Sequence, residues 1–179
     1  MSSSSLTVEP LLQTEQGLFR QLYALYLHDL SEFSDFYQLD ATGHWTPDYL
    51  PTWLAPADPR VRPFLFRLDG KPLGFALVGA RPFPYRSVEA DYRLSEFFVL
   101  RQHRRGGWGR LAAQCLFDRL PGCWEMVQLA RNKPAIAFWQ RVIADYTGGD
   151  YQNLLIEGEM GQRFRCAGHK AGAAPSLAG

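Results

Sequence analysis

Apolar residues recur at helical spacing in the N-terminal part of the chain. One row comprises Leu11, Leu18, Leu22 and Leu25. A second row of aromatic and leucine residues runs beside it, so the two rows form one broad apolar stripe. This pattern predicts an amphipathic helix over residues 11–30 that faces a core. The short apolar run 6–9 before it ends at Pro10 and predicts a first strand.

The middle of the chain alternates apolar runs with turn residues, as the strands of a sheet do. Runs 61–68 and 73–80 flank the turn Asp69-Gly70-Lys71, which predicts a hairpin. A further apolar run, 93–100, follows a proline-rich loop and predicts the next strand. The aromatic segment 31–57 is interrupted by prolines, and we expect short helices and loops there.

The C-terminal half alternates helix and strand patterns. Apolar residues share one helical face over 110–120, and Pro121-Gly122 ends that helix. The remaining expected elements are a strand over 125–130, a helix over 133–146, and two strands near 151–157 and 162–166. The chain thus predicts an α/β domain, a mixed sheet with helices on both faces.

The composition fits one globular domain. With 179 residues, of which 46% are apolar and 14% aromatic, the chain can bury a substantial core. We expect the domain to span residues 6–166, between a disordered N-terminus (1–5) and a flexible tail (167–179), because both ends are small and polar. The net charge of +1 gives no general attraction to nucleic acid or membrane.

Neither the cysteines nor the ends of the chain suggest a metalloprotein or an exported protein. The three cysteines and four histidines have no metal-ligand spacing, so we expect reduced thiols and no metal. The start lacks the features of a signal peptide, and no apolar run reaches the length of a membrane span. We therefore expect a cytoplasmic protein without a membrane partner, and the sequence leaves open whether it is a monomer or a homodimer.

The turn Arg104-Arg105-Gly106-Gly107-Trp108-Gly109 lies between a predicted strand and a predicted helix. Glycines let the main chain approach a ligand, and the N–H groups and dipole of a helix N-terminus favour an anion. The sequence has neither a P-loop pattern nor the glycine pattern of a dinucleotide-binding fold. We therefore expect a phosphate site of another kind, with a solvated connection as the alternative.

Two blocks resemble motifs of one superfamily. Residues 99–109 match the pattern V-x-P-x-x-[QR]-x-x-G-x-[GA], with Arg101 where proline is common. The block Asn132-x-x-Ala135-x-x-Phe138-Trp139 resembles the pattern N-x-x-A-x-x-F-Y. With these motifs and its order of elements over residues 6–166, the chain resembles the GNAT superfamily of acyl-CoA-dependent N-acyltransferases.

The resemblance implies a fold, a co-substrate and its binding residues. The fold is a mixed, mostly antiparallel sheet of about seven strands in the order β-α-α-β-β-β-α-β-α-β-β, and the co-substrate is acetyl-CoA. Main-chain amides of the turn would hold its pyrophosphate, namely those of Arg105, Gly106, Gly107, Trp108 and Gly109. The backbone of Phe98, Val99 and Leu100 would pair with the pantetheine arm. Asn132 would contact the arm or adjacent backbone, and Arg104 either contacts a phosphate or is solvated.

The chemistry of amine acylation calls for a base. An amine with a pKa near 10 is mostly protonated at pH 7, and its deprotonation costs about 4 kcal/mol. Glu96, an acidic residue inside an apolar strand, is the candidate general base, and an outward-facing residue or a structural ion pair is the alternative. Where the family often has a tyrosine acid, this chain has Trp139, which has no usable acidic proton. Tyr146, on the same helix, is either a substitute acid or a packing residue, and the reaction can also proceed without a dedicated acid.

The expected function is transfer of an acetyl group from acetyl-CoA to a primary amine of a small molecule or peptide by direct attack. The alternative is a non-catalytic acyl-CoA-binding regulatory module on the same fold, because Trp139 replaces the tyrosine and the role of Glu96 is open. Acidic and aromatic residues over 29–45 either line a pocket for a cationic acceptor or form a solvated face. A nucleic-acid patch around Arg101 and Arg110 is disfavoured by the near-neutral net charge.

Overall fold

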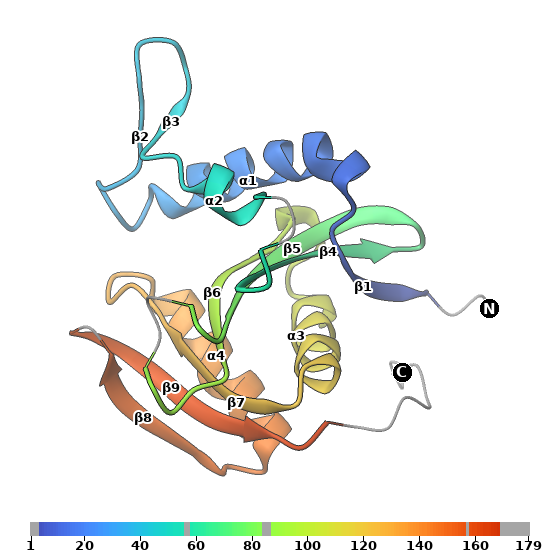
Figure 1. The fold of residues 1–179 in the computed structure, drawn as a ribbon, viewed down its shortest axis with the longest axis vertical. Helices are drawn as coiled ribbons and strands as arrows, with labels where there is room; N and C mark the ends of the chain where they lie inside the picture. The colour runs from blue at the N-terminus through green and yellow to red at the C-terminus, as the bar shows by residue number, and fades with distance from the viewer. Residues whose placement is uncertain (1–3, 56–57, 84–86, 157, 169–179) are drawn as a thin grey trace.

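One seven-stranded sheet organises the chain (Figure 1). The structure is a computed structural model that describes residues 4–55, 58–83, 87–156 and 158–168. The strand order is β1-β4-β5-β6-β7-β9-β8, and the β6–β7 pair is parallel while the other pairs are antiparallel. The strands are β1 (Leu6–Pro10), β4 (Val61–Leu68), β5 (Lys71–Ala80), β6 (Tyr92–Val99), β7 (Gly122–Val127), β8 (Tyr151–Ile156) and β9 (Glu159–Cys166).

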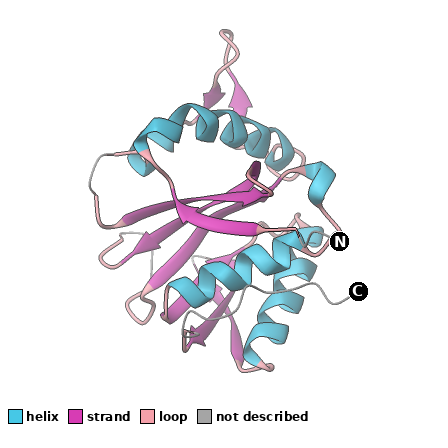
Figure 2. Ribbon diagram, turned by 90° about the vertical axis from the view of Figure 1, so that its right-hand side faces the viewer, coloured by secondary structure: helices cyan, strands magenta, loops and turns pink. Residues whose placement is uncertain are grey.

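Helices cover both faces of this sheet (Figure 2). The helices α1 (Gln16–Leu30) and α2 (Leu50–Trp53) pack on one face, where their buried side chains join those of Leu65, Phe75 and Phe98 in one core cluster. The helices α3 (Trp108–Arg119) and α4 (Lys133–Thr147) pack on the other face in a second cluster that includes Phe66 and Trp124. The predicted fold class, a mixed and mostly antiparallel seven-stranded sheet with helices on both faces, is confirmed.

The first helix begins later than its apolar pattern predicts. The Leu11 amide donates to the Pro63 carbonyl at 2.9 Å, so this residue still runs alongside β4. The Leu12 amide donates to the Glu15 carboxylate at 3.1 Å, and a 3-10 turn (Gln13–Glu15) leads into α1. The contact of Leu11 with β4 and the 3-10 turn that follows keep residues 11–15, the first five of the expected helix, out of α1.

The segment expected to hold short helices and loops also contains a small hairpin. Its strands are β2 (Gln38–Leu39) and β3 (Trp45–Thr46), and it projects from the rest of the molecule near the N-terminal end of α2 (Figure 1). The Asp40 carboxylate closes the loop by accepting hydrogen bonds from the amides of Thr42 (2.8 Å) and His44 (3.0 Å). Only α2 agrees with the expected helices. Residues 56–57 of the segment lie outside the described residues.

Two C-terminal strands begin earlier than predicted. Strand β7 starts at Gly122 rather than at residue 125, because Gly122 and Cys123 already pair with β9. The Cys123 amide also donates to the Asp91 carboxylate at 2.8 Å. Strand β9 starts at Glu159 rather than at residue 162. Of the expected disordered ends, residues 1–3 and 169–179 lie outside the described residues, whereas Ser5 exchanges hydrogen bonds with Asp69.

Candidate active site

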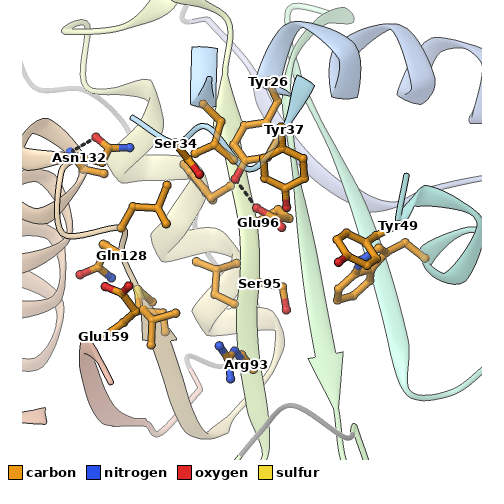
Figure 3. Close-up of a pocket in the computed structure, with 18 of the residues that line it drawn as sticks. Tyr26, Ser34, Tyr37, Tyr49, Arg93, Ser95, Glu96, Gln128, Asn132 and Glu159 are labelled. Atoms are coloured by element: carbon orange, nitrogen blue, oxygen red, sulfur yellow. Dashed lines mark hydrogen bonds between the residues drawn. The ribbon is translucent and has the colours of Figure 1, made fainter. Parts of the chain in front are cut away.

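The two central parallel strands separate partway along their length. Strands β6 and β7 pair only at Tyr92–Trp124, Arg93–Glu125 and Leu94–Met126, although β6 continues to Val99. A cavity of about 920 Å³ opens where the pairing stops, and it is lined by residues of α1, α2, α4, β6 and β7 (Figure 3). The gap in the sheet therefore gives access to groups that a continuous sheet would cover.

One edge of the gap carries main-chain groups of β6. The Leu100 amide donates to the Leu73 carbonyl at 2.9 Å, so Gly74 and Val99 form a non-hydrogen-bonded pair in the β5–β6 register. Residues in such a pair turn their own N–H and C=O groups away from the partner strand. The main-chain groups of Val99, and of Phe97 two residues earlier, thus face the gap. Those of Phe98 and Leu100, which the sequence analysis grouped with Val99, face β5.

A β-bulge directs Glu96 to the face covered by α1. The register between β5 and β6 shifts because Leu77 pairs with Glu96 while Val78 pairs with Leu94, leaving Ser95 as the extra residue. Leu94 therefore lies on the α3 and α4 face, and Glu96 lies on the opposite face with Phe98. Without the bulge, strict alternation would place Leu94 and Glu96 on the same face.

Glu96 is a carboxylate that lines the cavity. The Tyr26 hydroxyl, from α1, donates a short hydrogen bond to its Oε2 atom, and Figure 3 shows the two side chains pointing toward each other. Burial raises the pKa of Glu96 to about 7, although the Tyr26 hydrogen bond and the charge of Arg93 lower it. A carboxylate with a pKa near neutrality can both accept and release a proton at physiological pH.

Aromatic side chains form the wall beside Glu96. Tyr26 packs against Phe75 and Phe98, with ring centroids 5.6 and 6.0 Å away. Burial, followed by the charge of Glu96, raises the pKa values of Tyr26 and Tyr37, so both phenols stay protonated. Of the acidic and aromatic segment 29–45, the residues Leu30, Ser34, Phe36 and Tyr37 line the cavity, whereas its carboxylates do not.

The glycine turn forms the N-terminus of α3. Arg105 and Gly107 have positive φ angles of 68° and 80°. Gly107 is the N-cap of α3, so no side chain of the N-cap residue occupies the first amides of the helix. The first amides of a helix have no acceptor within the helix, so they are directed toward the turn's exterior. A Cβ atom on Gly109 would lie 3.4 Å from the Phe138 ring, within ordinary van der Waals contact, so α3 faces α4 at this position.

Arg104 ties this turn to β6 and to α1. Its Nε atom donates to the Val99 carbonyl at 2.8 Å, and its Nη2 atom forms a short ion pair with Asp29. Arg101 also bonds to Asp29, at 2.7 Å. Burial raises the pKa of Asp29, but the hydrogen bonds and charges of these two arginines outweigh burial and lower it overall. The side chain of Arg104 is thus engaged on the protein side of the turn.

The second motif block faces the cavity from α4. Asn132 is the N-cap of α4, because its Oδ1 atom accepts the Ala135 amide at 3.1 Å. Trp139 is buried and contacts Phe97 in a T-shaped arrangement with ring centroids 4.9 Å apart. Both Asn132 and Trp139 line the cavity, so the structure brings this block and Glu96 to the same space.

Tyr146 lies elsewhere. Its hydroxyl donates to the Asp118 carboxylate at 2.7 Å, and its ring packs on Phe117 in the core between α3 and α4. Burial, then the bond to Asp118, raises its pKa. The residue does not line the cavity, and its contacts are those of a packing residue, which was one of the two alternatives for it.

Several cavity residues were not anticipated from the sequence. Tyr26 belongs to the apolar stripe of α1, so its pattern predicts a core residue. Phe97 lies in an apolar run, so its pattern predicts an ordinary strand position. Gln128 is a lone polar residue in an apolar run, and that contrast was the available signal.

In the part of the chain that the structure describes, no cluster of three or more His, Cys, Asp or Glu residues could hold a metal ion. Among the same residues, no helix is long and apolar enough to cross a membrane.

The sequence profile of the acetyltransferase (GNAT) family matches residues 20–143, and the chain belongs to this family. The family uses acetyl-CoA as its co-substrate, and acyl transfer is accordingly the general activity of the chain. No protein of curated function matches the sequence significantly.

Solved structures share the fold at low sequence identity. An acetyltransferase from Thermus thermophilus is 21% identical over 92% of this chain and 99% of its own, with a TM-score of 0.65. The ribosomal-protein-S18-alanine N-acetyltransferase from Escherichia coli is 15% identical over 94% and 99%, with a TM-score of 0.54. An aminoglycoside acetyltransferase from an uncultured soil metagenomic sample, solved with sisomicin, is 16% identical over 76% and 86%, with a TM-score of 0.53.

Proposed function

We propose that this protein transfers the acetyl group of acetyl-CoA to a primary amine of a small molecule or peptide, by direct attack and with Glu96 as the general base. One observation carries the proposal. Glu96 lies in the cavity where β6 and β7 separate, and its pKa of about 7 suits it to take a proton from an amine at neutral pH.

The residues around the gap fit coenzyme A. The open β6 edge offers the main-chain groups of Phe97 and the N–H of Val99 to an amide-bearing arm, as a strand edge does for an added strand, while the Val99 carbonyl accepts from Arg104. The amides from Arg105 to Gly109 and the α3 dipole suit a pyrophosphate. Each charge-assisted hydrogen bond there contributes about 1.5–3 kcal/mol, so a few of them are sufficient to hold the phosphates.

A cationic primary amine loses two protons in this reaction. Glu96 accepts the first, directly or through a water molecule, and Tyr26 keeps the carboxylate oriented by its hydrogen bond. The neutral nitrogen then attacks the thioester carbonyl carbon, a C–N bond forms, and the C–S bond breaks as the thiolate leaves. The nitrogen loses its second proton to solvent. A main-chain N–H of the open β6 edge near the thioester would stabilise the developing oxyanion.

A dedicated acid is not part of this mechanism. Trp139 lines the cavity at the motif position where the family often has a tyrosine, and its indole N–H is a donor without useful acidity. Tyr146 is held by Asp118 outside the cavity. The coenzyme A thiolate is a good leaving group because its thiol pKa is modest, so it can depart unprotonated and take a proton from solvent.

The cavity favours an acceptor with both a cationic amine and apolar surface. Glu96 supplies negative charge, while Tyr37, Tyr49 and Trp53 supply aromatic faces that attract a cation. Among the structurally similar proteins, one acetylates a peptide alanine and another is an aminoglycoside acetyltransferase, and both of these acceptors are amines. Their acceptors support an amine here without choosing between a peptide and a small molecule.

The proposal is tested by ligand binding and by turnover. Thermal unfolding should show stabilisation by acetyl-CoA and coenzyme A, and a panel of primary amines should release free thiol from acetyl-CoA. Glu96→Gln should lower kcat/KM by about 10²- to 10⁴-fold and leave the affinity for coenzyme A within about twofold. Stabilisation by ATP but by no coenzyme A species would contradict the acyl-CoA site.

The same assays separate an enzyme from a binding module. Tight binding of acetyl-CoA without thiol release across the amine panel would favour a regulatory acyl-CoA sensor, for which Trp139 at the tyrosine position is the motivating observation. An acetyl-enzyme intermediate on a cysteine, detected by mass spectrometry, would exclude direct attack.

A further inference from the structure

Gln128 is a buried side chain whose amide has no hydrogen-bond partner among the described residues. The residue is 5% exposed, and among the described residues neither its Oε1 nor its Nε2 atom has a hydrogen-bond partner. Buried polar groups in folded proteins are almost always paired, so this amide calls for a partner from outside the chain.

The side chain lines the cavity on the side of α4. Trp124 and Met126 of β7 lie in the core beneath α3 and α4, and alternation along the strand places Gln128 on that same face. The main-chain amide of Gln128 donates to the Met160 carbonyl at 3.2 Å, so the strand direction continues to this residue. Figure 3 shows Gln128 across the cavity from Glu96, on the side of Asn132.

The chemistry of the amide selects its partner. An unpaired donor and an unpaired acceptor on one side chain are matched by a secondary amide, which also has one of each. The pantetheine arm of coenzyme A contains two secondary amides. The glycine turn lies at the N-terminus of α3, on the same face of the sheet as Gln128, whereas Glu96, the base for the acceptor, lies on the opposite face.

We infer that the Gln128 side chain binds an amide of the coenzyme A arm and thereby positions the thioester in the gap. This inference rests on the proposed acyl-CoA function and adds a residue outside both sequence motifs. Gln128 is a positioning residue, because it holds the arm rather than the reacting atoms. The unpaired amide destabilises the unliganded protein, and binding of the ligand completes the site.

The test compares two ligands and two variants. Gln128→Met keeps the length of the side chain and removes both hydrogen-bonding groups. Gln162→Met is the matched control, since Gln162 is a buried glutamine (1% exposed) with an unpaired Oε1 atom and is absent from the cavity lining. Affinities are measured by calorimetry for coenzyme A and for adenosine 3′,5′-bisphosphate, which keeps the nucleotide end but lacks the arm.

Gln128→Met should weaken coenzyme A binding about tenfold, the effect of losing one or two hydrogen bonds, and leave the affinity for adenosine 3′,5′-bisphosphate unchanged. Gln162→Met should change neither affinity. The unliganded Gln128→Met protein should fold and melt no lower than the wild type, because an unsatisfied buried group has been removed.

Three results would overturn the inference while leaving the proposed function standing. They are an unchanged coenzyme A affinity, an equal weakening of both ligands, and a higher KM for the amine alone, which would assign Gln128 to the acceptor. A wild-type protein that binds no coenzyme A would instead overturn the proposed function, and the inference with it.

Discussion

The hydroxyl of Tyr26 donates a hydrogen bond to Glu96 and so connects α1 to the bulged part of β6. This contact joins residues 70 positions apart in the sequence. It favours the charged form of a carboxylate whose burial favours the neutral form, and the balance leaves the pKa of Glu96 at about 7. The Tyr26 hydroxyl is therefore expected to set the pH range in which Glu96 can act as a base.

Tyr26→Phe should move the acidic limb of the rate profile to higher pH. The hydrogen bond lowers the pKa of Glu96, so its removal raises that pKa, and the active carboxylate form then appears only at higher pH. A hydrogen bond to a charged group contributes about 1.5–3 kcal/mol, which corresponds to about 1–2 pH units. The measurement is kcat/KM between pH 5 and 9, where wild-type activity should rise through pH 7 or so.

Tyr146→Phe is the matched control for this experiment. It also removes one tyrosine hydroxyl from a hydrogen bond to a carboxylate, but the bond is to Asp118 and lies outside the cavity. The limb should stay in place, and kcat should be retained. A large loss of kcat in Tyr146→Phe would instead support this residue as the acid, and an unmoved limb in Tyr26→Phe would separate Glu96 from the titration.

The glycine turn provides a second prediction. Gly107 has a φ of 80°, which a β-branched residue does not adopt without strain. Gly107→Val should therefore rotate the amides at the start of α3 and weaken coenzyme A binding at least about 100-fold, the effect of losing two charge-assisted hydrogen bonds. Calorimetric titration with coenzyme A measures it.

Gly148→Val controls for backbone strain. Gly148 is the C-cap of α4 and has a φ of 64°, and a side chain there would meet nothing within 4 Å. This variant should lose thermal stability as Gly107→Val does but keep its affinity for coenzyme A. If the two variants bind coenzyme A equally well, the turn does not hold the pyrophosphate.

Arg104 offers a third prediction, because holding the turn in place and contacting a phosphate lead to different results. Its bonds to Val99 and Asp29 hold the turn against β6 and α1, and we expect this positioning to be its role. Arg104→Gln and Asp29→Asn should then both weaken coenzyme A binding several-fold, while stability changes by about 1 kcal/mol or less, as for most exposed ion pairs. If Arg104 contacts a phosphate instead, only Arg104→Gln should weaken binding, and Asp29→Asn should leave it equal or stronger.

The sequence allowed the fold and part of the site to be predicted, for a local reason. The glycine turn, the strand before it and the start of α4 are set by residues close together in the chain, so their patterns are readable without a structure. Glu96 was found because an acidic residue interrupts an apolar run. These features depend little on which distant segments pack against them.

The remainder depends on long-range contacts. The bulge at Ser95 arises from pairing with β5, and it decides which face Glu96 occupies. The role of Tyr26 depends on α1 crossing β6, and the unpaired amide of Gln128 depends on where β6 and β7 separate. A periodic pattern cannot encode these relationships, because each one is a property of two or more segments brought together by the fold.

Close approach of β5 and β6 gives the last prediction. A Cβ atom on Gly74 would lie 2.0 Å from the Phe98 carbonyl oxygen and 3.0 Å from the Val99 Cα atom, both of which are backbone atoms. Gly74→Ala must therefore push β5 away from β6, the strand that holds Glu96 and the open edge. We expect a loss of about 1–3 kcal/mol or more in the free energy of unfolding and weaker binding of coenzyme A. Gly17→Ala is the control, since this position in α1 has nothing within 4 Å and should gain about 0.5–1 kcal/mol. Urea unfolding of both variants measures the difference, and a Gly74→Ala protein as stable as the wild type would show that the close approach is not required.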